Sequence, residues 1–131
     1  MNKTEESVFD ENEKEIVNLL INLGLSKNVS KTLVFLFRVK ETIPVSIERN
    51  MDLRQPEVSV ALKKLEEKGW VEKRNIKRGT RGRPMSSYKL SLSPEKIMDF
   101  LEEKKFDEIK KIKENVEKIR GIIEKNEGDN N

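Results

Sequence analysis

Three side chains that hydrogen-bond well to base edges stand close together in the chain: Arg54, Gln55 and Glu57. Arginine pairs with guanine O6 and N7, glutamine pairs with adenine N6 and N7, and glutamate accepts a hydrogen bond from cytosine N4. The serine and lysines that follow suit contacts to phosphate, and proline adds a rigid surface without a donor. The candidate DNA-contacting residues of this stretch are Arg54, Gln55, Pro56, Glu57, Ser59, Val60, Lys63 and Lys64.

An amphipathic helix is predicted over the stretch that carries these residues, 53–70. Its apolar residues recur at the spacing of one helical face and are Val58, Ala61, Leu62 and Leu65. Pro56 suits the first turn, where its missing N–H has no partner to lose. Gly69 supplies a C-terminal stop. The alternative interpretation is that the polar residues form only a solvated face and its cap.

A strongly basic hairpin is predicted directly after this helix, with strands over 70–76 and 85–92. Residues 73–89 include seven basic residues and no acid, whereas the whole chain has a net charge of +3. A local block of one sign indicates a polyanionic partner. Arginine at a glycine-rich tip, here beside Gly79 and Gly82, suits a narrow minor groove. The candidate residues are Lys73, Arg74, Lys77, Arg78, Arg81 and Arg83. A merely solubilising loop would instead mix both signs.

Three further helices are predicted before this region, over 10–23, 28–40 and 44–50, with 41–44 as a connection and 50–53 as a tight turn. The first is expected to turn Ile16, Leu19, Leu20 and Leu23 inward. The second is the densest in apolar residues and is expected to be the central core helix, through Val29, Leu33, Val34, Leu36 and Phe37. In the hairpin, Tyr88, Leu90 and Leu92 are expected to alternate inward.

A long helix is predicted from Pro94, with Ser93 as its N-cap, to about Lys125. Its later part has a coiled-coil seam with steps of three and four residues, formed by Ile109, Ile112, Val116, Ile119 and Ile123. We expect this seam to pair with a second subunit, the alternative being that it folds back along its own chain. The earlier part, with Ile97, Phe100 and Leu101, is out of phase and is expected to pack on its own domain.

Several functional classes are disfavoured by composition. The chain has no Cys and no His, which excludes disulfides, the usual zinc sites and the commonest general base. We therefore expect no enzyme activity, no metal and no cofactor. The polar, acidic N-terminus is unlike a signal peptide, and no apolar run approaches the length of a membrane span. These features predict a cytoplasmic protein without a membrane partner.

The run LRQPEVSVALKKLEEKGWVEKR, followed by GRPMSSYKL and a long C-terminal helix, resembles the archaeal winged helix-turn-helix transcriptional regulators related to the TrmB, MarR and ArsR groups. The resemblance covers about Leu23 to Leu101. It implies a homodimer that binds specific double-stranded DNA, with the recognition helix in the major groove and the basic wing on the flanking backbone or minor groove. We expect no sugar-binding domain like that of larger TrmB-like proteins, and the chain lacks the Cys and His of metal-sensing ArsR proteins. The sequence therefore leaves open whether a small-molecule effector binds.

Together these inferences predict an α+β, mainly helical fold. Disorder is expected over 1–9 and 127–131, a winged helix-turn-helix DNA-binding domain over 10–93, and a coiled-coil dimerisation helix over 94–126. The predicted function is transcription regulation on double-stranded DNA. The alternative is a winged-helix accessory factor of the transcription machinery that binds a protein or a single-stranded nucleic acid; there the basic wing would meet an acidic protein surface or a single strand.

Overall fold

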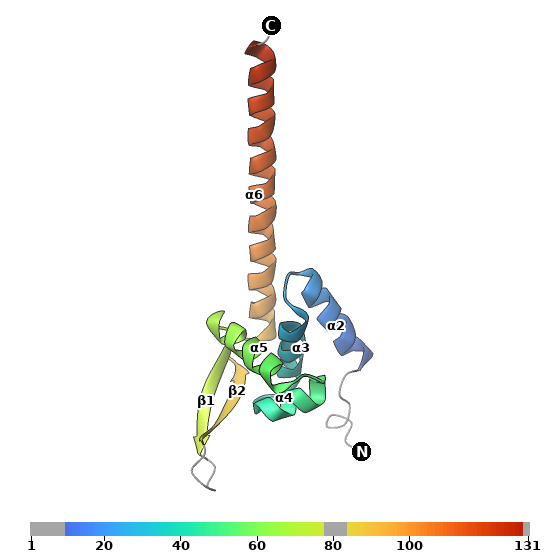
Figure 1. The fold of residues 1–131 in the computed structure, drawn as a ribbon, viewed down its shortest axis with the longest axis vertical. Coiled ribbons are helices and arrows are strands. Elements are labelled where there is room, and N and C mark those ends of the chain that lie inside the picture. The colour runs from blue at the N-terminus through green and yellow to red at the C-terminus, as the bar shows by residue number, and fades with distance from the viewer. Residues whose placement is uncertain (1–9, 78–83, 130–131) are drawn as a thin grey trace. The chain divides into compact units, whose positions relative to one another are not determined.

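The computed structural model describes residues 10–77 and 84–129, and the chain divides into two units, residues 1–94 and 95–131 (Figure 1). The first unit contains four helices and one hairpin within the described residues. Its elements are α2 (Glu11–Asn22), α3 (Lys27–Arg38), α4 (Pro44–Met51), α5 (Gln55–Glu67), β1 (Val71–Lys77) and β2 (Pro84–Leu90). The helix α6 (Pro94–Asp129) begins at the last residue of the first unit and makes up the described part of the second. The predicted α+β, mainly helical class is confirmed, and so is the winged helix-turn-helix order of elements.

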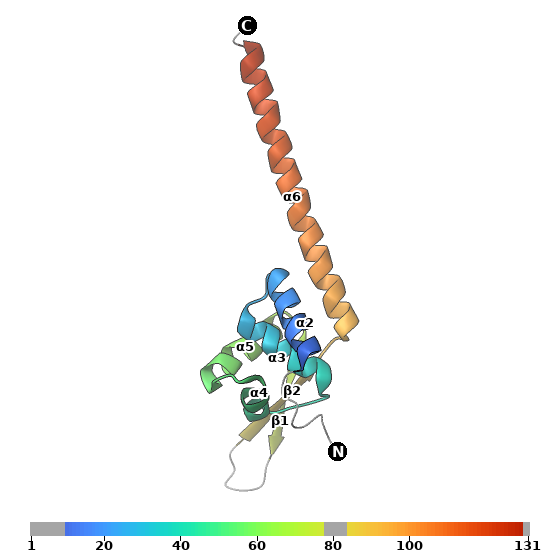
Figure 2. The same ribbon diagram turned by 90° about the vertical axis from the view of Figure 1, so that its right-hand side faces the viewer.

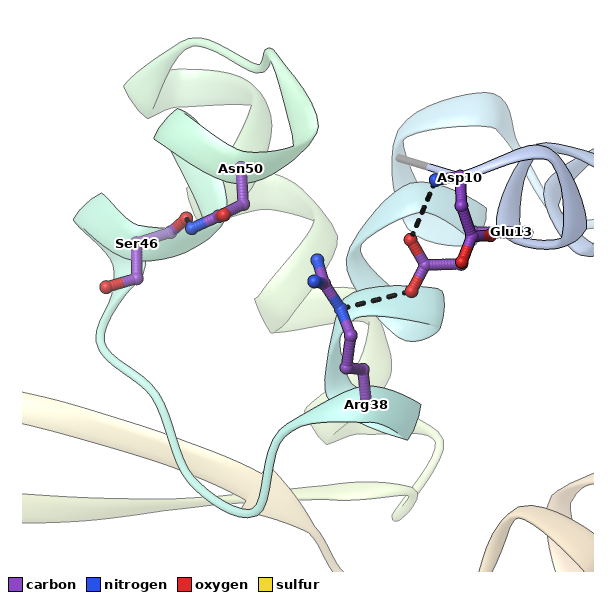
Figure 3. A network of polar contacts seen from close by, with 5 residues as sticks. All are labelled: Asp10, Glu13, Arg38, Ser46 and Asn50. Atoms are coloured by element: carbon purple, nitrogen blue, oxygen red, sulfur yellow. Dashed lines mark hydrogen bonds and ion pairs between the residues drawn. The ribbon is translucent and has the colours of Figure 1, made fainter. Parts of the chain in front are cut away.

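The helix α2 begins with reciprocal hydrogen bonds between its first residues. The Asp10 carboxylate accepts from the Glu13 N–H at 2.8 Å, and the Glu13 carboxylate accepts from the Asp10 N–H at 3.4 Å. This capping box satisfies two backbone donors that a helix start would otherwise leave free. Figure 3 shows that the same Glu13 carboxylate also faces Arg38 of α3, with 3.0 Å between Oε2 and Nε. The pair is mostly buried and fastens the start of α2 to the end of α3.

The inward face of α2 differs from the predicted one. Val17 and Leu20 are buried, whereas Ile16 and Leu19 are 38% and 53% exposed. Apolar residues occupy positions 16, 17, 19, 20, 21 and 23, so they surround much of the helix. The hydrophobic period therefore does not single out one face, and packing against α3 selects the face that carries Val17.

The helix α3 is the core helix, as predicted, and it contacts α2, α4, α5 and β2. Val29, Leu33, Val34 and Leu36 are buried. Phe37 is only half-buried, and Phe35 takes the core position instead. Because neighbours cover α3 on several sides, Ser30 and Thr32 are also completely buried, and neither hydroxyl has a hydrogen-bond partner within the described residues.

The helix-turn-helix is formed by α4 and α5, with only residues 52–54 between them (Figure 2). Pro44 occupies the start of α4, and the side chain of Asn50 donates to the Ser46 carbonyl at 2.8 Å (Figure 3). Asp52 adopts a left-handed conformation with φ of 55°, which ends α4 and turns the chain. Ile47 and Met51 are fully buried, so α4 is locked to the core.

The hairpin that forms the wing pairs β1 with β2 in an antiparallel register from Val71 opposite Leu90 to Lys77 opposite Pro84. Gly69, with φ of 79°, separates α5 from β1, as the predicted helix stop requires. The prediction for the inward side of β2 is only partly correct, because Tyr88, Leu90 and Leu92 are half-buried. Ser87, whose side chain points to the opposite face of the strand, is fully buried.

A third strand-like segment joins the wing where only a connection was predicted. Thr42 and Tyr88 exchange both backbone hydrogen bonds, at 3.0 and 2.8 Å, in an isolated antiparallel bridge. The bridge holds the α3–α4 connection against β2. A single residue pair leaves no periodicity in the sequence, so no pattern predicts it.

The second unit, α6, is one continuous helix of 36 residues. At 1.5 Å per residue its length is about 54 Å. It ends four residues beyond the predicted limit at Lys125. Among the described residues, no helix has the length and apolar character needed to cross a membrane.

Candidate nucleic-acid interface

The helix α5 has one buried face and one exposed face, as its sequence predicts. Val58, Ala61, Leu62 and Leu65 are at most 2% exposed, which fixes the helix in position and rotation. Of the eight candidate residues, seven have exposed side chains: Arg54, Gln55, Pro56, Ser59, Val60, Lys63 and Lys64. The structure therefore brings the candidates together along one helix surface whose leading end carries Arg54 and Gln55.

Glu57 differs from the other candidates because its carboxylate has an internal partner. It accepts a hydrogen bond from the Arg54 backbone N–H at 2.8 Å, and its side chain is half-buried. The contact satisfies a free donor at the helix start and places a negative charge at the positive end of the helix dipole. Glu57 thus orders the segment that presents Arg54 and Gln55. Sequence reasoning assigned this residue only to base reading.

The wing candidates are divided by the structure. Lys73 and Arg74 have exposed side chains on β1, and Lys77 is the last residue of that strand. Arg78, Arg81 and Arg83 lie outside the described residues. The opposite strand carries Lys89, whose Nζ lies 3.8 Å from the Glu72 carboxylate in the register pair Glu72–Lys89. Residues 73–89 contain no acid, but the folded hairpin places Glu72, just outside this stretch, beside Lys89.

Glu41 is the residue that sequence reasoning missed at the base of the wing. Its carboxylate accepts from the Ser87 hydroxyl and lies 2.9 Å from Nη2 of Arg74. The Ser87 hydrogen bond and then the Arg74 guanidinium hold the pKa of Glu41 below its ordinary value. The cluster fastens β1 and β2 to the segment before α4. No sequence pattern indicates this cluster, because its three residues lie 13 to 46 positions apart and meet only in the folded chain.

A hollow of about 410 Å³ runs beside α5, between that helix and the start of α3. Val29 and Ala61 are buried beneath it, and Pro56 and Val60 stand exposed along it. The residues that line it are Ser26, Asn28, Val29, Pro56, Glu57, Val60, Ala61 and Lys64. A smaller hollow of about 310 Å³ between α2 and α3 is lined by Lys14, Val17, Asn18, Lys27 and Lys31.

The predicted seam of α6 is exposed along its whole length. Ile109, Ile112, Val116, Ile119 and Ile123 are each between 40% and 60% exposed. Phe106 and Ile122 flank this seam and are exposed as well. A regular apolar stripe of this size on a long helix is a surface that favours pairing with another helix. Within residues 10–77 and 84–129, no group of three acidic side chains is placed to hold a metal ion.

Comparison with known proteins supports the fold. No family model matches the chain, and no curated protein matches it. A solved structure described as a possible transcriptional regulator from Methanosarcina mazei Go1 is similar, with a TM-score of 0.63 and 14% sequence identity over 82% of this chain and 86% of that one. TrmBL2, described as an archaeal chromatin protein with a novel mode of DNA binding, matches with a TM-score of 0.67 and 17% identity over 85% of this chain. The match spans only 40% of the TrmBL2 chain.

Proposed function

We propose that this protein is a transcriptional regulator that binds specific double-stranded DNA as a homodimer. The observation that carries the proposal is the exposed face of α5, where Gln55, Ser59 and Lys63 project opposite a face that is fixed in the core. In the winged helix-turn-helix fold this face is the one that enters the major groove. The solved structures of similar fold, described as a possible transcriptional regulator and as a DNA-binding chromatin protein, agree with it.

Base reading is assigned to the leading end of α5 and phosphate binding to its later part. Arg54 and Gln55 are exposed at the N-terminus of the helix, and Glu57 orders the backbone that carries them. Bidentate contacts of such side chains to guanine and adenine discriminate between bases. Ser59, Lys63 and Lys64 are assigned to contacts with DNA phosphates, which hold the helix in register on the duplex. The function needs no catalytic residue and no cofactor.

The wing supplies further positive charge beside the helix. Lys73 is exposed on β1. In the sequence the basic run continues through Lys77, Arg78, Arg81 and Arg83. Each phosphate that these residues neutralise releases counterions, which steepens the dependence of log K on log salt by about 0.9. The Arg74 guanidinium already contacts Glu41, so we assign it mainly to holding the wing.

Dimerisation is assigned to the seam Ile109–Ile123 of α6, which repeats apolar residues at steps of three and four. Two copies would place two recognition helices on half-sites about 34 Å apart, one turn of DNA. A palindromic site is therefore expected.

The test is selection of duplex DNA from a random pool by the purified full chain, followed by gel shifts with the selected duplex and each of its single strands. A palindromic motif and a preference for the duplex would support the proposal. Stronger binding of single strands, or no binding of either, would overturn it and favour the alternative of an accessory factor that meets a single strand or an acidic protein surface.

A further inference from the structure

The centre of the exposed face of α5 is apolar. Val60 is 54% exposed, while Val58, two residues earlier, is fully buried. Two residues correspond to about 200° around a helix, so Val60 points away from the core. Pro56 lies one turn before Val60 and is exposed too. The two residues form a stripe without any hydrogen-bonding side-chain atom, between Ser59 and Lys63 on one side and Lys64 on the other.

The space beside this stripe is open. The hollow of about 410 Å³ borders Pro56 and Val60, with Val29 and Ala61 beneath it. Its polar lining comes from Ser26, Asn28, Glu57 and Lys64. An apolar group that approaches Val60 therefore also contacts the apolar lining of the hollow. A sugar–phosphate backbone that passes over the hollow would lie near Lys64.

Among the base edges in the major groove, thymine is the one that presents an apolar group, its 5-methyl. Amino and carbonyl groups of the other bases lose water without compensation when they face a valine. We infer that Val60, supported by Pro56, contacts thymine methyl groups and makes the protein select thymine at one or two positions of each half-site. The inference rests on the proposed function, since it requires α5 to lie in the major groove.

Deoxyuridine isolates this contact, because it differs from thymidine only by the missing methyl. Each thymine of the selected duplex is replaced in turn, and binding by the full chain is measured by fluorescence anisotropy. At one or two positions per half-site, the loss of one buried methyl should weaken binding by about three- to fivefold. In Val60→Ala the same replacements should change affinity less than twofold, because the methyl no longer has its partner.

Lys63→Ala is the matched control on the same helix face. It should weaken binding to the thymine and uracil duplexes alike and leave their ratio at the wild-type value. The inference is overturned if the selected site contains no thymine, if no replacement weakens wild-type binding, or if Val60→Ala retains the full effect. If the protein binds the selected duplex and one of these three results is found, only the thymine contact is refuted. A protein that binds no duplex refutes the proposed function itself.

Discussion

The Arg74 guanidinium on β1 lies 2.9 Å from the Glu41 carboxylate, 33 residues earlier in the chain. The same carboxylate accepts a hydrogen bond from the buried Ser87 of β2. One acidic side chain therefore holds both strands of the wing against the segment that leads into the helix-turn-helix. This contact and the adjacent bridge between Thr42 and Tyr88 hold the wing to the α3–α4 connection. The proposed binding of α5 and the wing to one DNA surface depends on this arrangement.

Replacing Glu41 with Gln should make stability less dependent on pH in the acid range. The Ser87 hydrogen bond and Arg74 lower the pKa of Glu41 in the folded state, so its stabilising effect is complete above the unfolded pKa of about 4.3 and is lost as the pH falls through the lower folded value. Urea unfolding of wild type and Glu41→Gln should differ at pH 7 and converge toward pH 3. Glu72→Gln, which loses only a 3.8 Å contact on the surface, should change the midpoint little at any pH. A gap between wild type and Glu41→Gln that stays constant with pH would contradict this role.

Two glycine substitutions should have opposite effects on stability. Gly69→Ala places a side chain at φ of 79°, and the strained backbone should cost about 1–2 kcal/mol although nothing lies near the added Cβ. Gly121→Ala, inside α6 and equally free of close neighbours, should raise helix stability by about 0.5–1 kcal/mol. Thermal unfolding followed by circular dichroism measures both. If both variants were stabilised, or both destabilised, the left-handed conformation of Gly69 and the helical conformation of Gly121 could not both be correct.

The wing arginines should govern the salt dependence of DNA binding. Replacing Arg78, Arg81 and Arg83 with Ala should flatten the slope of log K against log salt by about 2–3 units if each neutralises one phosphate. The matched control is Lys104, Lys110 and Lys111→Ala on α6, which removes the same charge at a distance in sequence from the predicted interface. An unchanged slope in the wing variant, or the same flattening in both, would remove the wing from the interface.

Gln55→Ala should reduce sequence discrimination. Loss of a bidentate contact to adenine should cost about 1–3 kcal/mol on the selected site and much less on random duplex DNA. Lys64→Ala, which removes a proposed phosphate contact, should instead weaken binding to both duplexes by a similar factor. Titrations of each variant with the two duplexes at one salt concentration separate the roles, and equal losses for Gln55→Ala would show that it reads no base.

Ile119→Asp should convert the proposed dimer to a monomer, because a carboxylate in the centre of an apolar seam is buried without a partner. Lys118→Asp, one position outside the seam, carries an acid as well and should remain dimeric. Sedimentation equilibrium reports the mass directly. A monomeric wild type, or a dimeric Ile119→Asp variant, would rule out this seam as the interface.

The spacing of apolar residues predicted the buried face of a helix correctly where these residues form a single stripe. The face of α5 followed from Val58, Leu62 and Leu65, because a helix covered on one side only must turn its single apolar stripe inward. The pattern failed where apolar residues surround a helix. In α2 it selected Ile16 and Leu19 rather than Val17, and in α3 it selected Phe37 rather than Phe35, since only the neighbouring elements decide which side is covered.

The sequence by itself determined the order of helices and strands, the exposed face of α5, the basic hairpin and the regular seam of α6, because these depend on residues a few positions apart. Only the tertiary structure decided that Glu41 joins Arg74 and Ser87, that Thr42 pairs with Tyr88, and that the start of α3 forms a hollow beside Val60. These relationships join residues about 30 to 50 positions apart. Such contacts form when the core closes and leave no periodic signal along the chain.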